Sequence, residues 1–404
     1  MRLALINQFY PPDLSPTAHL AASLVQHRVA LGDRVTVLAG TGRYIKAPAA
    51  EPAVGRGNPK LFRLWTPSLG KDSLLRRLLD YAAFYVQAAV LVMTLPRQDV
   101  LILMTTPPYI ALVGLFHKAL HARTRLLLWN MDSYPETAER AGLISPGSLP
   151  SRILRVLNRI LYRHLEAVVC LDSAMRDLLA SAYVIHDRPK VYVLPNWEPE
   201  ALFPHDSSAP EWELGQSLRL YGRFVVLYLG NAGEGHSFET VLDAASRLQD
   251  TPVVFLFVGG GTAWESLREE VAARGLTNVI LRAYIDKAET PAALACADVA
   301  LITLRDSMLG VMSPSKLHAS LAMGVPILYL GPAGGNVDEA IRTYGCGISL
   351  RHGDTQGMVQ FIERVRREAT YRSSLRSKAR HAFEDGYSDR VVLPRFDSII
   401  KDKR

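Results

Sequence analysis

The stretch FVVLYLGNAGEGHSFETVLDAASRLQDTPVVFLFV, residues 224–258, decides the fold class. Its two ends, 224–229 and 253–258, are continuous apolar runs of strand length, which is typical of strands buried on both faces. Between them lies a glycine-rich loop, followed at 238–248 by apolar residues at helical spacing. A strand, a loop, a helix and a second strand in this order predict a βαβ unit with parallel strands.

The same alternation continues downstream to residue 330. The pattern predicts helices at 264–274, 291–296 and 314–323, and strands at 278–281, 298–303 and 326–330. The chain before residue 195 alternates in the same way, with expected strands at 3–7, 34–39, 100–104, 125–129, 167–171 and 190–194. Alternation of this kind favours a parallel sheet covered by helices on both faces.

Proline and glycine interrupt the pattern between Asn196 and Gly222, which we interpret as a linker. We therefore expect an α/β protein with two facing Rossmann-like domains, at 1–198 and 199–385, and an inter-domain cleft. A C-terminal helical segment, 386–404, is expected to pack back toward the first domain. Ligands of such folds bind at the carboxyl ends of the strands.

The net charge of +7 is unevenly distributed along the chain. Through Glu200 there are 23 Lys and Arg against 15 Asp and Glu, whereas the remainder has 23 against 24. A basic half favours an anionic partner, either a membrane surface or a phosphorylated acceptor. We expect no nucleic-acid partner, because the sequence has no aromatic-basic RNA motif and no zinc-finger spacing.

Two segments bear on membrane contact. The apolar stretch 81–96 is short for a bilayer span, which takes roughly 20 residues. It is either a helix packed on a sheet or a helix lying partly in a membrane interface. The segment 152–164 sets four arginines against an apolar face, and it is either a membrane-surface helix or a solvated face of a packed helix.

The N-terminus and the cysteines indicate the compartment. The N-terminus turns polar too soon for a secretory signal, and the three cysteines have no metal-ligand or disulfide-framework spacing. We expect a cytoplasmic protein, either free or peripheral on the inner face of the cytoplasmic membrane.

The loop 230–236 follows a strand and precedes a helix. Its glycines allow a ligand to approach the backbone, and a helix N-terminus favours an anion. His236 could add a cationic or donor contact to a diphosphate, although a simple crossover loop is the alternative. The first βα loop lacks the G-x-G-x-x-G pattern, which argues against a dehydrogenase. Pro16 and Thr17 could still offer backbone N–H groups to a phosphate, unless Ser15 or Thr17 is an ordinary N-cap.

The segment 312–326, MSPSKLHASLAMGVP, is the most specific in the chain. Proline in the first turn and Gly-x-Pro at the end predict a compact helix. Ser313 and Ser315 can donate hydrogen bonds, and Lys316 places a point charge at the helix start, where phosphate neutralisation is its natural use. A surface lysine is the alternative.

Candidate acid–base groups follow the strand 125–129. Asp132 and Glu136 lie at its carboxyl end, where an acceptor hydroxyl would bind. Helix capping and pairing with a nearby arginine is the alternative interpretation of these carboxylates. His19, near the start of the first helix, is a further candidate on the acceptor side with Pro16 and Thr17.

Taken in order, these motifs resemble the retaining, GT-B-fold glycosyltransferases of family 4, in particular the bacterial branch that builds surface polysaccharides. The matching landmarks are YPP at 10–12, TPP at 106–108, DSYPE at 132–136, VLPNW at 193–197, GNAGEGH at 230–236, FVGGG at 257–261 and PSK at 314–316. Each motif is weak alone, and the ordered set covers nearly the whole chain.

The resemblance implies a donor site in the second domain. The residues that it implies are Asn231, Gly233, His236, Gly260, Tyr284, Ser313, Ser315, Lys316 and Leu317. Asn231 and His236 occupy the positions of the Arg and Lys that grip the diphosphate in the family. The two glutamates of the family's E-x7-E arrangement fall on Val311 and Ala319, so both carboxylates are missing.

The implied reaction is transfer of a hexosyl or N-acetylhexosaminyl group from a nucleotide diphosphate sugar, UDP-linked first and GDP-linked second. The acceptor would be a hydroxyl of a saccharide or polyprenyl-linked molecule, and the anomeric configuration would be retained. We expect no cofactor and no metal, because the sequence has no Asp-x-Asp motif. The alternatives are a sugar-nucleotide epimerase of the same architecture and a non-catalytic relative that binds a sugar nucleotide.

Overall fold

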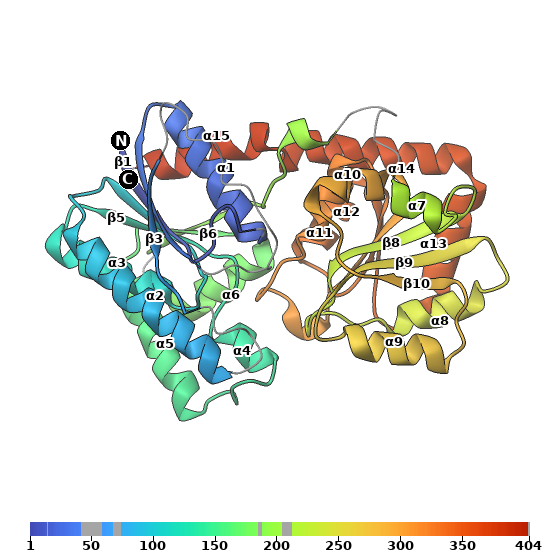
Figure 1. Ribbon diagram of the computed structural model, residues 1–404, viewed down its shortest axis with the longest axis horizontal. Helices are drawn as coiled ribbons and strands as arrows, with labels where there is room; N and C mark the ends of the chain where they lie inside the picture. The colour runs from blue at the N-terminus through green and yellow to red at the C-terminus, as the bar shows by residue number, and fades with distance from the viewer. Residues whose placement is uncertain (14, 42–58, 68–73, 185–187, 204–211, 403–404) are drawn as a thin grey trace. The chain divides into compact units, whose positions relative to one another are not determined.

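A computed structural model describes residues 1–13, 15–41, 59–67, 74–184, 188–203 and 212–402 (Figure 1). Two compact units emerge from its contacts. The first combines Met1–Leu194 with Gly310–Met312 and the chain from Leu393 onward, and the second combines Pro195–Leu309 with Ser313–Val392. Part of the expected linker, residues 204–211, lies outside the described residues.

The first unit contains a seven-stranded parallel sheet in the order β3-β2-β1-β4-β5-β6-β7. Its strands are β1 Arg2–Ile6, β2 Arg34–Gly40, β3 Lys60–Leu64, β4 Val100–Leu103, β5 Arg125–Trp129, β6 Ala167–Cys170 and β7 Lys190–Val193. Central strands β4 and β6 are buried at every position, which explains why they are continuous apolar runs in the sequence.

Helices cover both faces of this sheet. They are α1 Pro16–Ala30, α2 Leu74–Thr94, η1 Ile110–Leu112, α3 Val113–Leu120, α4 Glu136–Arg140, α5 Leu149–Tyr162, α6 Ser173–Tyr183 and the part of α15 (Asp389–Lys401) from Leu393 onward. Helices α1 and α15 lie on one side of the sheet, and α2, α3 and α5 lie on the other (Figure 1). The expected helix 152–164 begins earlier, at Leu149, because the Ser148 side chain accepts the Ser151 N–H and caps it.

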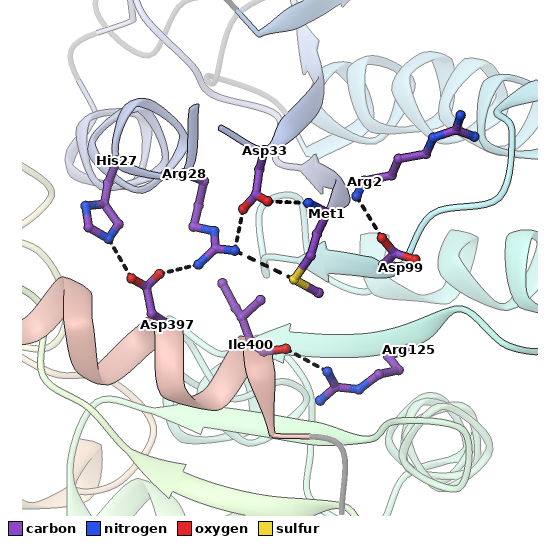
Figure 2. A network of polar contacts seen from close by, with 9 residues as sticks. All are labelled: Met1, Arg2, His27, Arg28, Asp33, Asp99, Arg125, Asp397 and Ile400. Atoms are coloured by element: carbon purple, nitrogen blue, oxygen red, sulfur yellow. Dashed lines mark hydrogen bonds and ion pairs between the residues drawn. The ribbon is translucent and has the colours of Figure 1, made fainter. Parts of the chain in front are cut away.

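The C-terminal helix α15 is tied to the first unit by a buried ionic network (Figure 2). Asp397 accepts hydrogen bonds from His27 Nε2 at 2.8 Å and from Arg28 Nη1 at 2.5 Å. Arg28 is buried and also pairs with Asp33. The Phe396 ring packs edge-on against the ring of Trp129 on β5, with centroids 4.9 Å apart.

Replacement of Asp397 by Ala should lower the free energy of unfolding by about 2–4 kcal/mol, because Arg28 loses one of its two buried carboxylate partners. Urea denaturation measures the change. The control is Asp177→Ala, which removes an exposed pair with Arg176 and should cost at most about 0.5 kcal/mol. Equal losses in the two variants would contradict the assigned role of Asp397.

The second unit contains a six-stranded parallel sheet in the order β10-β9-β8-β11-β12-β13. Its strands are β8 Phe224–Asn231, β9 Val253–Gly260, β10 Val279–Arg282, β11 Val299–Thr303, β12 Ile327–Leu330 and β13 Gly347–Leu350. The expected α/β class with two Rossmann-like parallel sheets is confirmed.

The four expected helices of the second unit are present as α8, α9, α10 and α11, whereas α12, α13 and α14 were not predicted. Its helical segments are η2 Glu200–Leu202, α7 Glu213–Ser217, α8 Glu239–Arg247, α9 Trp264–Ala273, η3 Lys287–Glu289, α10 Thr290–Ala295, η4 Asp306–Met308, α11 Lys316–Ala322, α12 Asn336–Tyr344, α13 Thr355–Arg367, α14 Ala369–Ala382 and η5 Phe383–Tyr387. Among the described residues, no helix is both long enough and apolar enough to cross a bilayer.

Strands β8 and β9 run two residues further than the sequence pattern predicts. Their last pairs are Gly230 with Gly259 and Asn231 with Gly260. Gly259 has φ +152°, and a Cβ at this position would lie 2.1 Å from the carbonyl oxygen of Gly230. Only glycine therefore lets the two strands stay together at this edge, which gives part of the glycine-rich pattern a structural cause.

Candidate functional site

Lys316 is the centre of a polar cluster at the carboxyl end of β8. Its Nζ donates to the backbone oxygen of Asn231 at 3.0 Å and lies 3.4 Å from His236 Nε2. The ammonium also sits 4.6 Å from the centroid of the Tyr228 ring. The first turn of α11, the end of β8 and the following loop thus bring together the expected donor-site residues Asn231, His236 and Lys316.

The charge of Lys316 is unbalanced. Burial lowers the pKa of its ammonium from 10.5 to about 7. In the described part of the chain, no carboxylate forms an ion pair with it. A partly buried cation without a counter-ion, held by neutral acceptors, has the electrostatics of an anion site.

His236 does not supply the expected cationic contact. Its Nδ1 lies 2.7 Å from the Thr303 carbonyl oxygen, and because a carbonyl only accepts, Nδ1 carries the hydrogen. Its Nε2 therefore offers a lone pair to Lys316. Burial, together with the charges of Lys316 and Arg305, lowers the pKa of His236 to about 3. The imidazole is neutral near pH 7, and it orients the ammonium instead of binding a phosphate as a cation.

Arg305 is a second cation at this site that the sequence analysis missed. It follows β11 closely and is exposed, and its Nε donates to the backbone oxygen of His236 at 2.8 Å. Its backbone N–H donates to Gly235 at 2.8 Å. Its position just after the expected strand 298–303 could have identified it as a candidate, because β11 and β8 are neighbours and their ends lie at the same sheet edge as the loop 230–236.

The rest of the expected donor site gathers around Asn231. The Tyr284 hydroxyl donates to Asn231 Oδ1 at 3.2 Å, and the Tyr284 ring is half-exposed. A Cβ on Gly260 would lie 2.8 Å from this ring, and one on Gly233 would lie 2.9 Å from Asn231 Nδ2. Gly260 and Gly233 therefore permit the close packing of Tyr284 and Asn231.

The residues around the start of α11 differ in their burial and in their hydrogen bonds. The hydroxyl of Ser313 is buried without a partner among the described residues, so it is free to bond a ligand. Ser315 is exposed, and its carbonyl accepts from His318 Nδ1 at 3.0 Å. Leu317 is fully buried, so its side chain belongs to the core and only its backbone could contact a donor.

Asp132 follows β5 in the first unit. The backbone N–H groups of Met131 and Asp132 donate to the Thr105 hydroxyl at 3.2 and 3.3 Å, which holds this turn in place. Asp132 is half-buried, and burial raises the pKa of its carboxyl to about 6. A carboxylate with this pKa is a suitable proton acceptor near neutral pH.

Glu136 has the partners of a structural residue. It is buried, and its Oε1 accepts from Arg155 Nη1 at 2.8 Å and from the Tyr183 hydroxyl at 2.7 Å. This is the arginine pairing that the sequence analysis left open as an alternative. Of the two predicted catalytic carboxylates, Glu136 forms an ion pair, and Asp132 forms none with the described residues.

We expect Glu136→Gln to lower the free energy of unfolding by about 1–2 kcal/mol, because Arg155 then keeps only Glu139 as an anionic partner. Urea denaturation measures this loss, with Glu265→Gln on an exposed ion pair as the control. A variant with full stability and strongly reduced kcat would instead support the catalytic prediction for Glu136.

The expected acceptor-side residues lie at the start of α1. Ser15 caps this helix, since its hydroxyl accepts the Ala18 N–H at 3.3 Å, and the capping alternative is confirmed for Ser15. Pro16 occupies the first turn, and the Thr17 hydroxyl lies 3.4 Å from that of Ser15. Pro16, Thr17 and His19 stay predictions as acceptor contacts.

Each half of the chain matches a known family. Residues 17–197 match the family described as Glycosyl transferase 4-like domain, and residues 223–368 match Glycosyl transferases group 1. The probable glycosyltransferase WbjE of Pseudomonas aeruginosa is 26% identical over 344 residues, which are 83% of this chain and 82% of that protein. A putative colanic acid biosynthesis glycosyl transferase, WcaI of Escherichia coli strain K12, is 24% identical over 378 residues, which are 90% and 92% of the two chains.

Solved structures share the whole architecture. HepE of Anabaena, in complex with UDP and glucose, superposes with a TM-score of 0.73 at 14% identity and covers 100% of both chains. At this identity the likeness concerns the fold. The two units described above therefore share their arrangement of strands and helices with HepE.

Proposed function

We propose that this chain, which belongs to the GT4 type of GT-B glycosyltransferases, transfers a sugar from a nucleotide diphosphate sugar to a hydroxyl with retention of the anomeric configuration. The observation that carries the proposal is the unbalanced ammonium of Lys316, held between Asn231 and His236. In the reaction, the bond between the anomeric carbon and the diphosphate breaks, and the diphosphate gains negative charge. Lys316 and Arg305 stabilise that charge.

The donor is a UDP-sugar in first place and a GDP-sugar in second, with a hexosyl or N-acetylhexosaminyl group. The UDP and glucose bound by HepE support this order. A thermal-shift screen with UDP, GDP, ADP and their sugars tests it, because a ligand that binds only the folded protein raises the melting temperature. The absence of any shift at millimolar concentrations of every nucleotide would refute the proposal.

The acceptor proton has two possible destinations, the Asp132 carboxylate and the leaving phosphate. No step of the proposed reaction uses a metal, in keeping with the lack of an Asp-x-Asp motif. Activity should therefore survive EDTA, and NMR of the product should show the anomeric configuration of the donor. A product of inverted configuration would overturn the retaining assignment.

The proposed acceptor is a saccharide or a polyprenyl-linked saccharide used in polysaccharide biosynthesis. Colanic acid biosynthesis in the name of WcaI supports this class, and so does the basic first half of the chain. The enzyme would work in the cytoplasm, peripheral on the inner face of the cytoplasmic membrane. Transfer to short polyprenyl diphosphate saccharides, compared with free saccharides, tests the acceptor class.

A second candidate function is a non-catalytic protein that binds a sugar nucleotide. It is favoured by Val311 and Ala319, which stand where the family's two glutamates fall. The two functions differ in one measurement. Nucleoside diphosphate release that depends on the acceptor identifies a transferase, whereas tight donor binding without release identifies the non-catalytic protein.

A further inference from the structure

Helix α5 carries an apolar stripe and a basic stripe side by side on its exposed face. The exposed apolar residues are Leu149, Ile153, Val156 and Ile160, which are 41–72% exposed. At 100° per residue, they fall within an arc of about 60°. The exposed arginines Arg152, Arg159 and Arg163 fall within the adjoining arc of about 40°. The helix contains no acidic residue.

These three arginines are uncompensated. No carboxylate in the described part of the chain forms an ion pair with Arg152, Arg159 or Arg163. Arg155, which lies between Arg152 and Arg159 in the helix, is instead neutralised by ion pairs with Glu136 and Glu139. The positive charge of the exposed face is therefore available to an external anion.

Helices α2 and α3 extend the apolar surface on the same side of the sheet (Figure 1). Helix α2 buries Phe84, Ala88 and Val92, so the expected packed helix is present. Its opposite face exposes Leu79, Val86, Val90 and Met93, and α3 exposes Phe116 and Leu120. More than half of the large apolar side chains exposed in the described part of the chain lie on α2, α3 and α5. A soluble surface rarely concentrates apolar side chains in this way.

We infer that the exposed faces of α2, α3 and α5 form a docking surface for an anionic lipid bilayer, with α5 lying in the interface. Apolar side chains of α5 would enter the acyl boundary, while the long arginine side chains reach the lipid phosphates beside them. In this arrangement the apolar stripe of α5 contacts acyl chains and the basic stripe contacts lipid phosphates. The inference rests on the proposed membrane-peripheral function, and it specifies which surface makes the contact.

Charge decides between a bilayer and a second copy of the chain. A symmetric dimer through α5 would place two sets of Arg152, Arg159 and Arg163 against each other with no carboxylate on the helix to pair with them. Like charges at such an interface are unfavourable. Anionic headgroups supply the missing negative charge and the adjoining acyl chains supply the apolar partner, so the bilayer fits both properties of the face.

Flotation of the full chain with liposomes tests the inference. The protein is mixed with vesicles of phosphatidylcholine alone or with about one third phosphatidylglycerol, and we expect binding to the anionic vesicles only. Ile153→Ser with Ile160→Ser should lower that binding at least tenfold. Arg159→Gln with Arg163→Gln should lower it on the order of twentyfold, and high salt should do the same.

Two control variants carry the same kinds of substitution, apolar to Ser and Arg to Gln, at exposed positions outside α5. Leu31→Ser with Leu202→Ser changes two residues that are 54% and 53% exposed, and Arg223→Gln with Arg247→Gln removes two exposed charges. Both controls should float like the wild type. The inference is overturned if the wild type does not float with anionic vesicles, if the α5 variants float undiminished, or if they abolish a concentration-dependent dimer instead.

The outcome is separable from that of the proposed function. UDP binding by thermal shift needs no vesicle, and it should be unchanged in the α5 variants, which also shows that they are folded. Flotation without UDP binding would keep the docking surface and refute the donor proposal. UDP binding without flotation would support the donor proposal and refute the docking surface.

Discussion

Replacing Asp132 with Asn is expected to lower kcat by roughly 10²–10⁴-fold, with little change in the affinity for UDP. The reason is that the amide keeps the shape of the side chain but cannot accept a proton from the acceptor hydroxyl. Because burial raises the pKa of Asp132 to about 6 in the ligand-free protein, the wild-type kcat/KM should also fall as the pH drops below about 6, where the carboxylate becomes protonated.

Steady-state kinetics between pH 5 and 8 give both results. In the variant, the acidic limb near pH 6 should be absent, and this would distinguish loss of a base from a structural defect. Asp177→Asn, at an exposed position of the same unit, is the control and should leave the profile unchanged. A variant with nearly full activity would show that the acceptor proton goes elsewhere, with the leaving phosphate as the remaining candidate.

Replacing Lys316 with Ala should weaken UDP binding by about a hundredfold or more. The substitution removes a partly buried cation that no carboxylate among the described residues neutralises, so the diphosphate loses a charge-assisted contact. Isothermal titration calorimetry measures the loss, with Lys378→Ala at an exposed position as the control. Unchanged affinity would refute the assignment of Lys316 to the diphosphate.

The lowered pKa of Lys316 gives this prediction a second, independent signature. In the free protein the ammonium titrates at about pH 7, and a bound diphosphate favours the protonated form and raises that pKa. Binding near pH 8 should therefore take up a proton, and the affinity should fall as the pH rises above 7. Titrations in buffers of different ionisation enthalpy count the proton, which should disappear in Lys316→Ala.

Most of the fold could be predicted because buried parallel strands are continuous apolar runs. Strand β5 was predicted at its observed bounds, Arg125–Trp129, since it is buried at all but its first position. The edge strands β3 and β13 were missed. Each buries only one of its residues, so neither has the apolar run that marks an interior strand.

The site was predictable to the extent that its residues follow strands or begin helices. Lys316 was found because Pro314 and the Gly-x-Pro at 324–326 mark out a compact helix in the sequence. The expected proline in its first turn is wrong, since α11 begins at Lys316 and Pro314 lies before the N-cap Ser315. Arg305 was missed because its relation to His236 depends on β11 lying next to β8, which is a property of strand order and not of local sequence. The second partner of Glu136, the Tyr183 hydroxyl, was equally impossible to predict, because Tyr183 lies far along the chain on another helix.

The network around Asp397 has a practical consequence for exchanging halves between transferases of this kind. The first unit is assembled from segments on both sides of the second unit in the sequence, because its ionic and aromatic anchors on α15, Asp397 and Phe396, follow the second unit. A hybrid cut once, near residue 194, would give Arg28 and Trp129 a foreign helix as neighbour. Such hybrids need two junctions, so that α15 is exchanged together with the rest of the first unit.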